Sequence, residues 1–259
     1  MLLAIDVGNT NIKYGVFDNK ELKASFRVSS RLTRTADEYG SVLLNLLQSS
    51  AIYKEDIDGI IISSVIPSLN YTICHMCEYF FNVKPLMIGS GIKTGLNVRV
   101  DHAKEVGADR IVNSVAGYAK YGKDNEPLIV IDFGTATTFN VLVGNTLIGG
   151  VIAPGIKTAL ESLVSGTAQL PMIELKAPKS AIAKDTETNM QACIIFGFSG
   201  LVEKIVEKIR VELGVPSVKV IATGGMGEVL SKEVSVITKF DRKLTLDGLR
   251  IIYELNCKK

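Results

Sequence analysis

The sequence predicts an α/β fold that is built from two similar halves. Apolar runs of strand length alternate along the chain with segments of helical periodicity, which is typical of strands and helices packed in layers. One short pattern also occurs twice, because residues 5–10 (IDVGNT) return as residues 131–136 (IDFGTA). The recurrence indicates that the two halves fold alike.

The similarity extends beyond the short pattern itself. Each copy ends an apolar run, LLAI in the first half and LIVI in the second, and each is followed by another apolar stretch and a polar turn. The turn contains Asn19 in the first half and Asn145 in the second, at the same distance from the aspartate of the pattern. Each copy therefore predicts a strand–turn–strand unit.

The remainder of the first half is predicted as alternating helices and strands. Thr35 and Glu38 have the spacing of a capping box, and the apolar residues in 39–47 recur on one face of the helix that it opens. The next segments are predicted as a strand, a helix, a strand and a helix, at residues 58–65, 69–81, 85–88 and 110–121.

In the second half, residues 156–166 have a helical pattern, and a longer helical region covers residues 186–213. We expect a bend in this region near Gly197 and Gly200. A strand at 218–222 and a closing helix at 245–256 complete the chain. These elements predict two ribonuclease H-like lobes, at residues 1–122 and 123–259, with a central cleft between them.

Composition and charge exclude several classes of protein. The 29 basic and 27 acidic residues leave a formal charge of +2, and the basic residues form no run with interleaved aromatic residues, so we expect no nucleic-acid partner. Asp6 precedes any signal-peptide core, and no apolar stretch approaches the length of a membrane span. We therefore expect a cytoplasmic protein that binds no membrane.

The cysteines and histidines give little support to a metal or redox site. Cys74 and Cys77 form a C-x-x-C pattern around His75, but no second pair completes a tetrahedral zinc site, and a buried helical pair of thiols is the alternative. His75 and His102 are the only histidines, so catalysis is not expected to depend on imidazole clusters.

Asp6, Gly8 and Thr10 form a D-x-G-x-T pattern at the end of the first predicted strand. A carboxylate in this place can anchor hydrated magnesium, and a glycine turn presents backbone N–H groups to phosphate. Thr10 and Asn11 add donors, and Lys13 adds a cation. For a single copy, the alternatives are an ordinary β-hairpin with a polar turn and a solvated Lys13.

The second copy, with Asp132, Gly134, Thr135 and Thr137, favours nucleotide binding, because two such loops can hold one triphosphate from both sides. This duplicated phosphate hairpin resembles the actin-like ATPase superfamily, which includes actin, sugar kinases and heat-shock ATPases. That superfamily also has a glycine pair after a late strand, where adenosine lies against backbone. Residues 222–225 (ATGG) resemble this element, although alone they indicate only a turn before a helix.

Residues 105–110 (EVGADR) resemble the acceptor-binding motif of type III pantothenate kinases. The resemblance extends over essentially the whole chain, and its landmarks are DVGNT, SSVIPS, DFGTATT, GGVIAPG and ATGG, in this order. It implies phosphorylation of pantothenate by ATP to 4′-phosphopantothenate, the first step of coenzyme A biosynthesis.

The resemblance also implies roles for individual residues. Asp109 is expected to be the catalytic base, whereas its sequence position alone suggests a helix cap, with Arg110 paired on the surface. The pantothenate site is expected to contain Val100, Gly107, Ala108, Asp109, Arg110 and Thr186. The ATP site is expected to contain Asp6, Val7, Gly8, Asn9, Thr10, Asn11, Ile12, Lys13 and Thr135.

The family resemblance implies two cations and a homodimer. Asp6 is expected to bind the Mg²⁺ of Mg²⁺–ATP through water, and Asp132 a monovalent cation, K⁺ or NH₄⁺. Thr186 is expected to reach the pantothenate site of the partner subunit, although as a sequence feature it is an ordinary helix cap.

The chain departs from the family pattern around the acceptor site. Val100 stands where the family usually has a tyrosine, and residues 102–103 (His-Ala) stand where Asn-Pro is common. Ala183 and Asp185 replace the usual glycine and asparagine ahead of Thr186. These changes affect the expected affinity for substrate more than the expected reaction.

The sequence is also compatible with two other functions. The first is a regulatory relative of the same fold, similar to transcriptional activators, that has lost catalysis; both hairpin aspartates and the complete GADR string argue against it. The second is an actin-like or chaperone-like ATPase, for which 259 residues leave little room for additional subdomains.

Overall fold

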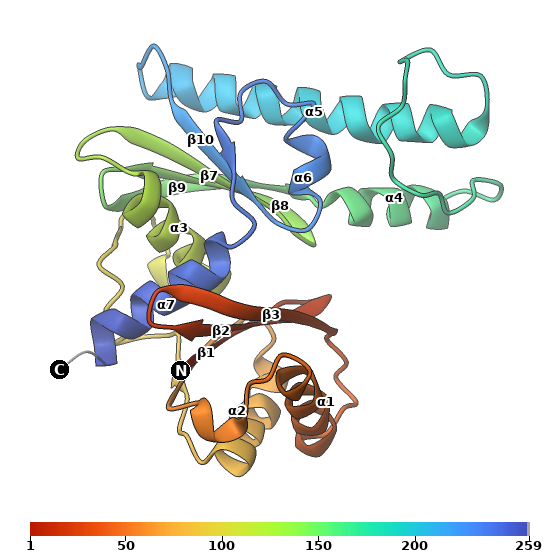
Figure 1. Ribbon diagram of the computed structural model, residues 1–259. Helices are drawn as coiled ribbons and strands as arrows, with labels where there is room; N and C mark the ends of the chain where they lie inside the picture. The colour runs from red at the N-terminus through yellow and green to blue at the C-terminus, as the bar shows by residue number, and fades with distance from the viewer. Residues whose placement is uncertain (258–259) are drawn as a thin grey trace. The chain divides into compact units, whose positions relative to one another are not determined.

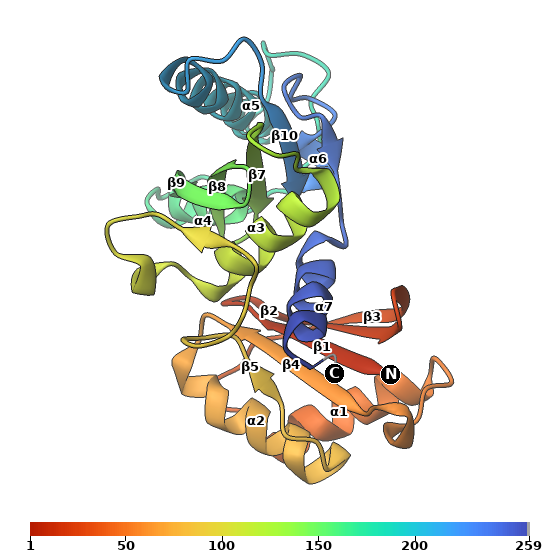
Figure 2. The same ribbon diagram turned by 90° about the vertical axis from the view of Figure 1, so that its left-hand side faces the viewer.

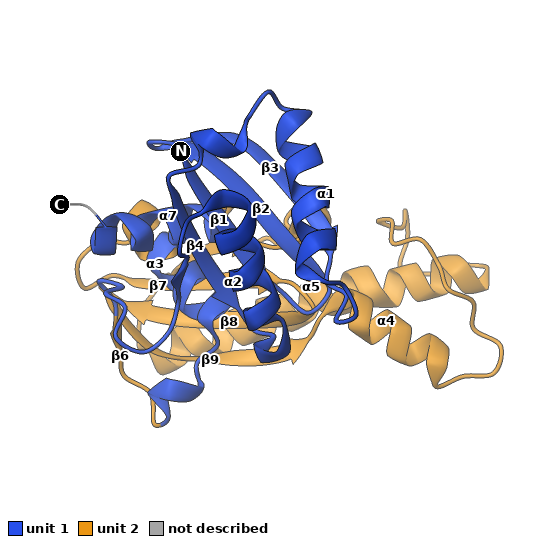
Figure 3. Cartoon of the chain, turned by 90° about the horizontal axis from the view of Figure 1, so that it is seen from below, with its two compact units in different colours: residues 1–96, 102–116, 244–259 blue, residues 97–101, 117–243 orange. Residues whose placement is uncertain are grey.

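The structure is a computed structural model that describes residues 1–257, and it divides into two compact units. Unit 1 contains residues 1–96 and 102–116 together with helix α7 (Leu244–Cys257), and unit 2 contains residues 97–101 and 117–243 (Figure 3). The expected lobes divide the chain once, near residue 122, whereas in the structure the last helix packs with the N-terminal sheet.

Unit 1 contains a five-stranded sheet in the order β3-β2-β1-β4-β5. Its strands are β1 (Leu2–Val7), β2 (Asn11–Asp18), β3 (Glu21–Ser29), β4 (Gly59–Ser64) and β5 (Leu86–Met87). The first three are antiparallel neighbours, and β4 and β5 run parallel to β1. Helices α1 (Ala36–Gln48) and α2 (Pro67–Phe81) cover one face and α7 covers the other (Figures 1 and 2).

Unit 2 repeats this arrangement. Its sheet has the order β11-β10-β7-β8-β9-β6. The strands are β7 (Pro127–Phe133), β8 (Ala136–Val143), β9 (Thr146–Pro154), β10 (Lys219–Thr223), β11 (Lys239–Phe240) and the added edge strand β6 (Asn97–Val98). Without β6, the order and the strand directions match those of unit 1. The predicted duplication of a ribonuclease H-like α/β unit is therefore confirmed.

The helices of unit 2 pack mainly on one face of its sheet. They are α4 (Ile156–Ser165), α5 (Thr186–Glu212) and the short α6 (Gly227–Leu230), and their apolar residues form one core with β7, β8 and β10. Helix α5 is continuous through Gly197 and Gly200, where we expected a bend (Figure 1). Helix α3 (Ala108–Tyr121) begins in unit 1 and ends in unit 2.

Local sequence signals explain several of these elements. Strand β1 is buried along its whole length, as its apolar run predicts. The capping box predicted at Thr35 and Glu38 is present at the start of α1. Asn82 ends α2 in the left-handed conformation that asparagine tolerates.

The C-x-x-C pattern lies on helix α2. Cys77 is buried in the core between α2 and the sheet, and burial raises the pKa of its thiol far above the ordinary value. Within residues 1–257, no group of three or more histidine, cysteine, aspartate or glutamate side chains is placed to hold a metal ion. No helix in the same range is long and apolar enough to cross a membrane.

Candidate active site

The first glycine hairpin joins β1 to β2 in unit 1. Asp6 lies near the end of β1 and is 6% exposed, and Lys13 lies directly opposite it on β2. The ammonium nitrogen of Lys13 lies 3.3 Å from Oδ2 of Asp6. A buried carboxylate and a cation therefore lie beside the loop that was expected to bind phosphate.

Hydrogen bonds hold this loop in shape. The backbone N–H of Gly8 donates to the carbonyl of Asn11 at 3.1 Å. Ser30, which follows β3, donates its hydroxyl to the carbonyl of Gly8 at 2.6 Å and its N–H to the carbonyl of Thr10 at 3.0 Å. Sequence reasoning missed Ser30, because a single serine after an exposed strand carries no distinguishing signal.

The second glycine hairpin repeats the two backbone hydrogen bonds with one residue fewer. The N–H of Gly134 donates to the carbonyl of Ala136, and the N–H of Gly155 donates to the carbonyl of Thr135, each at 3.1 Å. Thr135 therefore corresponds to Thr10, although the two sequence patterns align Thr10 with Ala136. The extra residue lies in the first loop, which spans residues 8–10, whereas the second spans residues 134–135.

Two glycines allow close backbone contacts around the second hairpin. A Cβ atom on Gly155 would lie 2.2 Å from the carbonyl oxygen of Thr135. Gly224 has a φ angle of +100°, and a Cβ atom there would lie 2.5 Å from Oδ1 of Asp132 and 2.6 Å from the backbone nitrogen of Phe133. The predicted adenosine element at residues 222–225 therefore packs directly against the hairpin aspartate.

Each hairpin aspartate has polar neighbours in register on both adjacent strands. In unit 1, Asp6 lies between Lys13 on β2 and Ser63 on β4. In unit 2, Asp132 lies between Thr138 on β8 and Thr223 on β10. Residues opposite one another in a sheet have side chains on the same face, so each aspartate belongs to a polar row.

The acceptor motif lies at the start of α3. Asp109 is the second residue of this helix, and its Oδ1 accepts a hydrogen bond of 2.8 Å from the N–H of Arg110. A Cβ atom on Gly107 would lie 2.5 Å from Oδ1 of Asp109 and 3.9 Å from Val65. A side chain at position 107 would therefore displace the Asp109 carboxylate from its place against this turn, next to the segment that follows β4.

The helix that begins at the acceptor motif packs on the face of the unit 1 sheet that carries Asp6. Leu2 and Ala4 pack with Val112 of α3, whereas Ile5 and Val7 pack on the opposite face, with α1 and α2. Because side chains alternate along a strand, Asp6 shares the face of Leu2 and Ala4. Unit 1 therefore brings a phosphate-loop carboxylate and the helix that begins with Asp109 to one face.

Arg110 is partly buried at the start of α3. Burial lowers the pKa of its guanidinium, and the neighbouring Asp109 charge opposes this change. Arginine remains charged at neutral pH in spite of such a shift. Arg110 is therefore a half-buried cation beside the expected base.

Thr186 is the first residue of helix α5, and Asp185 is its N-cap. The Asp185 carboxylate accepts hydrogen bonds of 2.8 Å from the N–H and the hydroxyl of Thr188, and these bonds lower its pKa. The alternative interpretation of Thr186 as a helix cap was therefore wrong, because the residue before it supplies the cap. The exposed Thr186 side chain is not used in this way.

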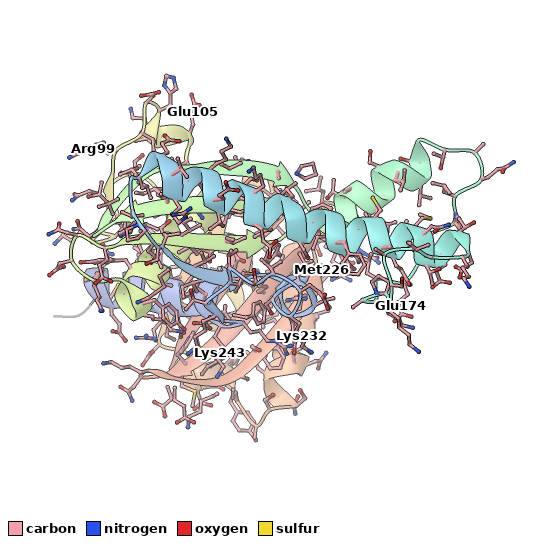
Figure 4. All side chains as sticks on the ribbon, turned by 90° about the horizontal axis from the view of Figure 1, so that it is seen from above. Arg99, Glu105, Glu174, Met226, Lys232 and Lys243 are labelled. Carbon is pink, nitrogen blue, oxygen red and sulfur yellow. The ribbon has the colours of Figure 1, made fainter. Side chains whose placement is uncertain are left out.

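Val100 and Thr186, both expected to contact pantothenate, lie at opposite ends of unit 2. Val100 comes directly after Arg99, close to the end of β6. Thr186 is the first residue of α5, at the end of this helix that projects beyond the sheet (Figure 4). Unit 2 therefore does not bring these two residues together.

The donor atoms near the hairpins suit hard cations. Carboxylate oxygens of Asp6 and Asp132, with threonine and serine hydroxyls beside them, are the oxygen ligands that Mg²⁺ and K⁺ prefer. Magnesium usually binds one or two carboxylates, several waters and the substrate phosphates. The residues present therefore fit cations that arrive with a nucleotide.

Solved structures of several proteins share this fold. A structure from Sinorhizobium meliloti described as a 2-dehydro-3-deoxygalactonokinase has a TM-score of 0.65 at 11% identity, covering 100% of this chain and 98% of that one. A structure from Campylobacter jejuni described as a Baf family transcriptional activator has a TM-score of 0.60 at 18% identity, covering 98% of both chains. An N-acetylglucosamine kinase structure from Porphyromonas gingivalis has a TM-score of 0.51 at 13% identity, covering 99% of both chains.

Sequence similarity identifies the family more narrowly than these structures do. The family model described as type III pantothenate kinase matches residues 2–208. The match includes both glycine hairpins, the acceptor motif and the start of α5. Because it covers most of the chain, the protein belongs to the type III pantothenate kinase family, a family of ATP-dependent kinases.

Proposed function

We propose that this protein transfers the γ-phosphoryl group of ATP to pantothenate and forms 4′-phosphopantothenate, the first step of coenzyme A biosynthesis. The observation that carries the proposal is the position of α3, which packs on the face of the unit 1 sheet that carries Asp6 and begins with Asp109 against Gly107. Family membership supports the same reaction.

Asp109 is the proposed general base. Its carboxylate accepts the proton of the substrate's primary hydroxyl as that oxygen attacks phosphorus, a contribution of about 10²- to 10⁴-fold. Gly107, Ala108 and Arg110 line the acceptor site, and the Arg110 guanidinium suits the carboxylate of pantothenate. Val100 takes the place of an aromatic contact and lowers the affinity for this substrate.

The two hairpins are the proposed phosphate-binding elements. Residues 6–13 and Thr135 bind ATP, with backbone N–H groups and the Lys13 ammonium meeting the phosphate oxygens. Asp6 binds Mg²⁺ through water and Asp132 binds K⁺ or NH₄⁺. These cations offset the negative charge of the triphosphate beside two carboxylates.

We propose that the enzyme is a cytoplasmic homodimer. Val100 and Thr186 lie at opposite ends of unit 2, so Thr186 of one subunit can serve the acceptor site of the other. Helix α5 also presents an exposed face formed by Cys193, Phe196, Gly197 and Gly200, on which the apolar ring of Phe196 lies beside two residues without a side chain. Such a face permits close packing of a second helix.

The deciding experiment measures ADP and 4′-phosphopantothenate in a mixture of protein, ATP, Mg²⁺, K⁺ and pantothenate. We expect the two products in equal amounts and little ADP when pantothenate is omitted. Absence of pantothenate-dependent ADP contradicts the proposal. It favours the second candidate, a regulatory relative without catalysis, which the fold shared with the Campylobacter jejuni protein supports.

A further inference from the structure

Ser63 is a buried hydroxyl residue beside the first hairpin aspartate. It lies on β4 in register with Asp6 on β1, and neighbouring strands lie about 4.8 Å apart. Ile60 and Ile62 pack on the face of α1 and α2, so Ser63 shares the opposite face with Ile61 and Asp6. The SSVIPS motif thus places a hydroxyl next to the phosphate loop.

The Ser63 hydroxyl is fully buried and makes no hydrogen bond within the part of the chain that the structure describes. A buried polar group without a partner costs free energy, and a methyl group would avoid this cost. The position of the hydroxyl therefore indicates a hydrogen bond that forms when the site binds its ligand. The in-register carboxylate of Asp6 is the charged acceptor beside it.

The second half of the chain repeats this pairing. Thr223 on β10 lies in register with Asp132 on β7 and is 1% exposed. The other neighbours of the two aspartates differ, because Lys13 in unit 1 corresponds to Thr138 in unit 2. The residue on the parallel strand therefore carries a hydroxyl in both units, whereas the residue on the antiparallel strand differs between them.

We propose that Ser63 is a positioning residue that donates its hydroxyl to the Asp6 carboxylate from the side opposite Lys13. Lys13 contacts Oδ2 of Asp6 at 3.3 Å, so a second donor on the other strand fixes the orientation of the carboxylate. A fixed carboxylate binds the hydrated cation of the nucleotide more tightly than a mobile one. This inference rests on the proposed function, because it requires that Asp6 serves a nucleotide-bound cation.

The test uses Ser63→Ala and Ser63→Thr and measures the affinity of each for Mn²⁺–ATP by electron paramagnetic resonance, without pantothenate. We expect about tenfold weaker binding by Ser63→Ala, the effect of one hydrogen bond to a charged group. We expect Ser63→Thr to bind like the unchanged protein, because Thr223 occupies the corresponding place in unit 2. The KM for pantothenate should remain unchanged in both.

Unchanged Mn²⁺–ATP affinity in Ser63→Ala overturns the inference, and so does an equal loss in both variants. Ser63→Ala removes one buried oxygen and is expected to keep the melting temperature, which a thermal scan checks. Failure of the unchanged protein to phosphorylate pantothenate contradicts the proposed function instead. The Mn²⁺–ATP affinities of the variants can still be compared in that case, because the measurement contains no pantothenate.

Discussion

The Lys13 ammonium lies 3.3 Å from Oδ2 of Asp6, and the two residues face each other across the β1–β2 pair. Asp6 is 6% exposed, so solvent screens this ion pair less than a surface pair. In unit 2 the corresponding neighbour of Asp132 is Thr138. The two hairpins therefore share two backbone hydrogen bonds but differ in the charge of the residue opposite the aspartate.

Replacing Lys13 with methionine should weaken ATP binding. The change removes a cation from the phosphate loop while keeping the length of the side chain, and we expect a loss of about 1 to 3 kcal/mol, or roughly 5- to 150-fold. Titration calorimetry with Mg²⁺ and a non-hydrolysable ATP analogue measures it. Lys23→Met is the control, because Lys23 pairs with Glu21 at 2.8 Å on the exposed strand β3. Equal affinities in the two variants contradict a phosphate-binding role for Lys13.

Much of the fold could be predicted because duplication leaves a local trace. The repeated IDxG pattern ends a buried strand in each half, and alternation of apolar segments predicted the helices that cover the sheets. Packing between distant segments leaves no such trace. The assignment of α7 to the N-terminal unit depends on contacts of Leu246, Leu249 and Ile252 with β1 and β4, which periodicity does not reveal.

The sequence predicted the two hairpins but not how their residues correspond. The patterns align Thr10 with Ala136, because sequence alone does not show that the first loop has one more residue than the second. Only the hydrogen bonds from Ser30 and Gly155 identify Thr135 as the equivalent of Thr10. Likewise, Thr186 and Asp185 are both good caps, and the structure was needed to assign the cap to Asp185.

Replacing Asp109 with asparagine should abolish most turnover without preventing ATP binding. Asparagine keeps a side-chain oxygen that can accept the hydrogen bond from the N–H of Arg110, so the start of α3 should be retained. It cannot accept the substrate proton as a carboxylate does, and kcat should fall by about 10²- to 10⁴-fold. A coupled ADP assay and ATP titration separate the two effects. Asp37→Asn, at the exposed second residue of α1, should keep its activity. Near-normal turnover in Asp109→Asn removes Asp109 from its proposed role.

Replacing Gly224 with alanine should destabilise unit 2 and weaken nucleotide binding. The added methyl group would lie 2.5 Å from Oδ1 of Asp132, in a backbone conformation with φ of +100° that alanine rarely adopts. We expect a loss of about 2 to 5 kcal/mol in stability, visible as a lower melting temperature in calorimetry. Gly89→Ala is the control, because a Cβ atom there meets nothing within 4 Å. Similar melting temperatures for both variants would show that the contact with Asp132 tolerates a side chain.

Replacing Phe196 with glutamate tests the proposed homodimer. Phe196 is 36% exposed on the face of α5 that carries Gly197 and Gly200, and a charge there should prevent close packing of a second subunit. Light scattering after size-exclusion chromatography should report a monomer with reduced pantothenate turnover. Leu255→Glu, on an apolar residue of α7 that is 48% exposed, should remain dimeric. A Phe196→Glu protein that is still dimeric excludes this face as the interface.

Asp241 should make stability depend on pH in the acidic range. Its carboxylate is 9% exposed and accepts hydrogen bonds from Lys120 at 2.6 Å and from the hydroxyl of Tyr121 at 2.7 Å. Burial alone would raise its pKa, but these bonds and the Lys120 charge hold the pKa below the ordinary value of 3.8. A carboxyl group with a lowered pKa stabilises the folded protein fully above the unfolded pKa and loses this contribution as the pH falls through the folded pKa.

Asp241→Asn should therefore melt at a lower temperature than the unchanged protein at pH 7, with a loss of about 1 to 3 kcal/mol from weaker bonds to Lys120 and Tyr121. The difference should begin to shrink as the pH falls below about 4, where Asp241 of the unfolded chain takes up a proton, and it should disappear as the pH falls through the lower pKa of Asp241 in the folded protein. Calorimetric scans at a series of pH values measure both melting temperatures. Asp124→Asn is the control, since Asp124 also accepts a tyrosine hydrogen bond, from Tyr118 at 3.1 Å, but is exposed. A difference that stays constant down to pH values near 3 would mean that the Asp241 charge contributes nothing and that only the shape of the side chain matters.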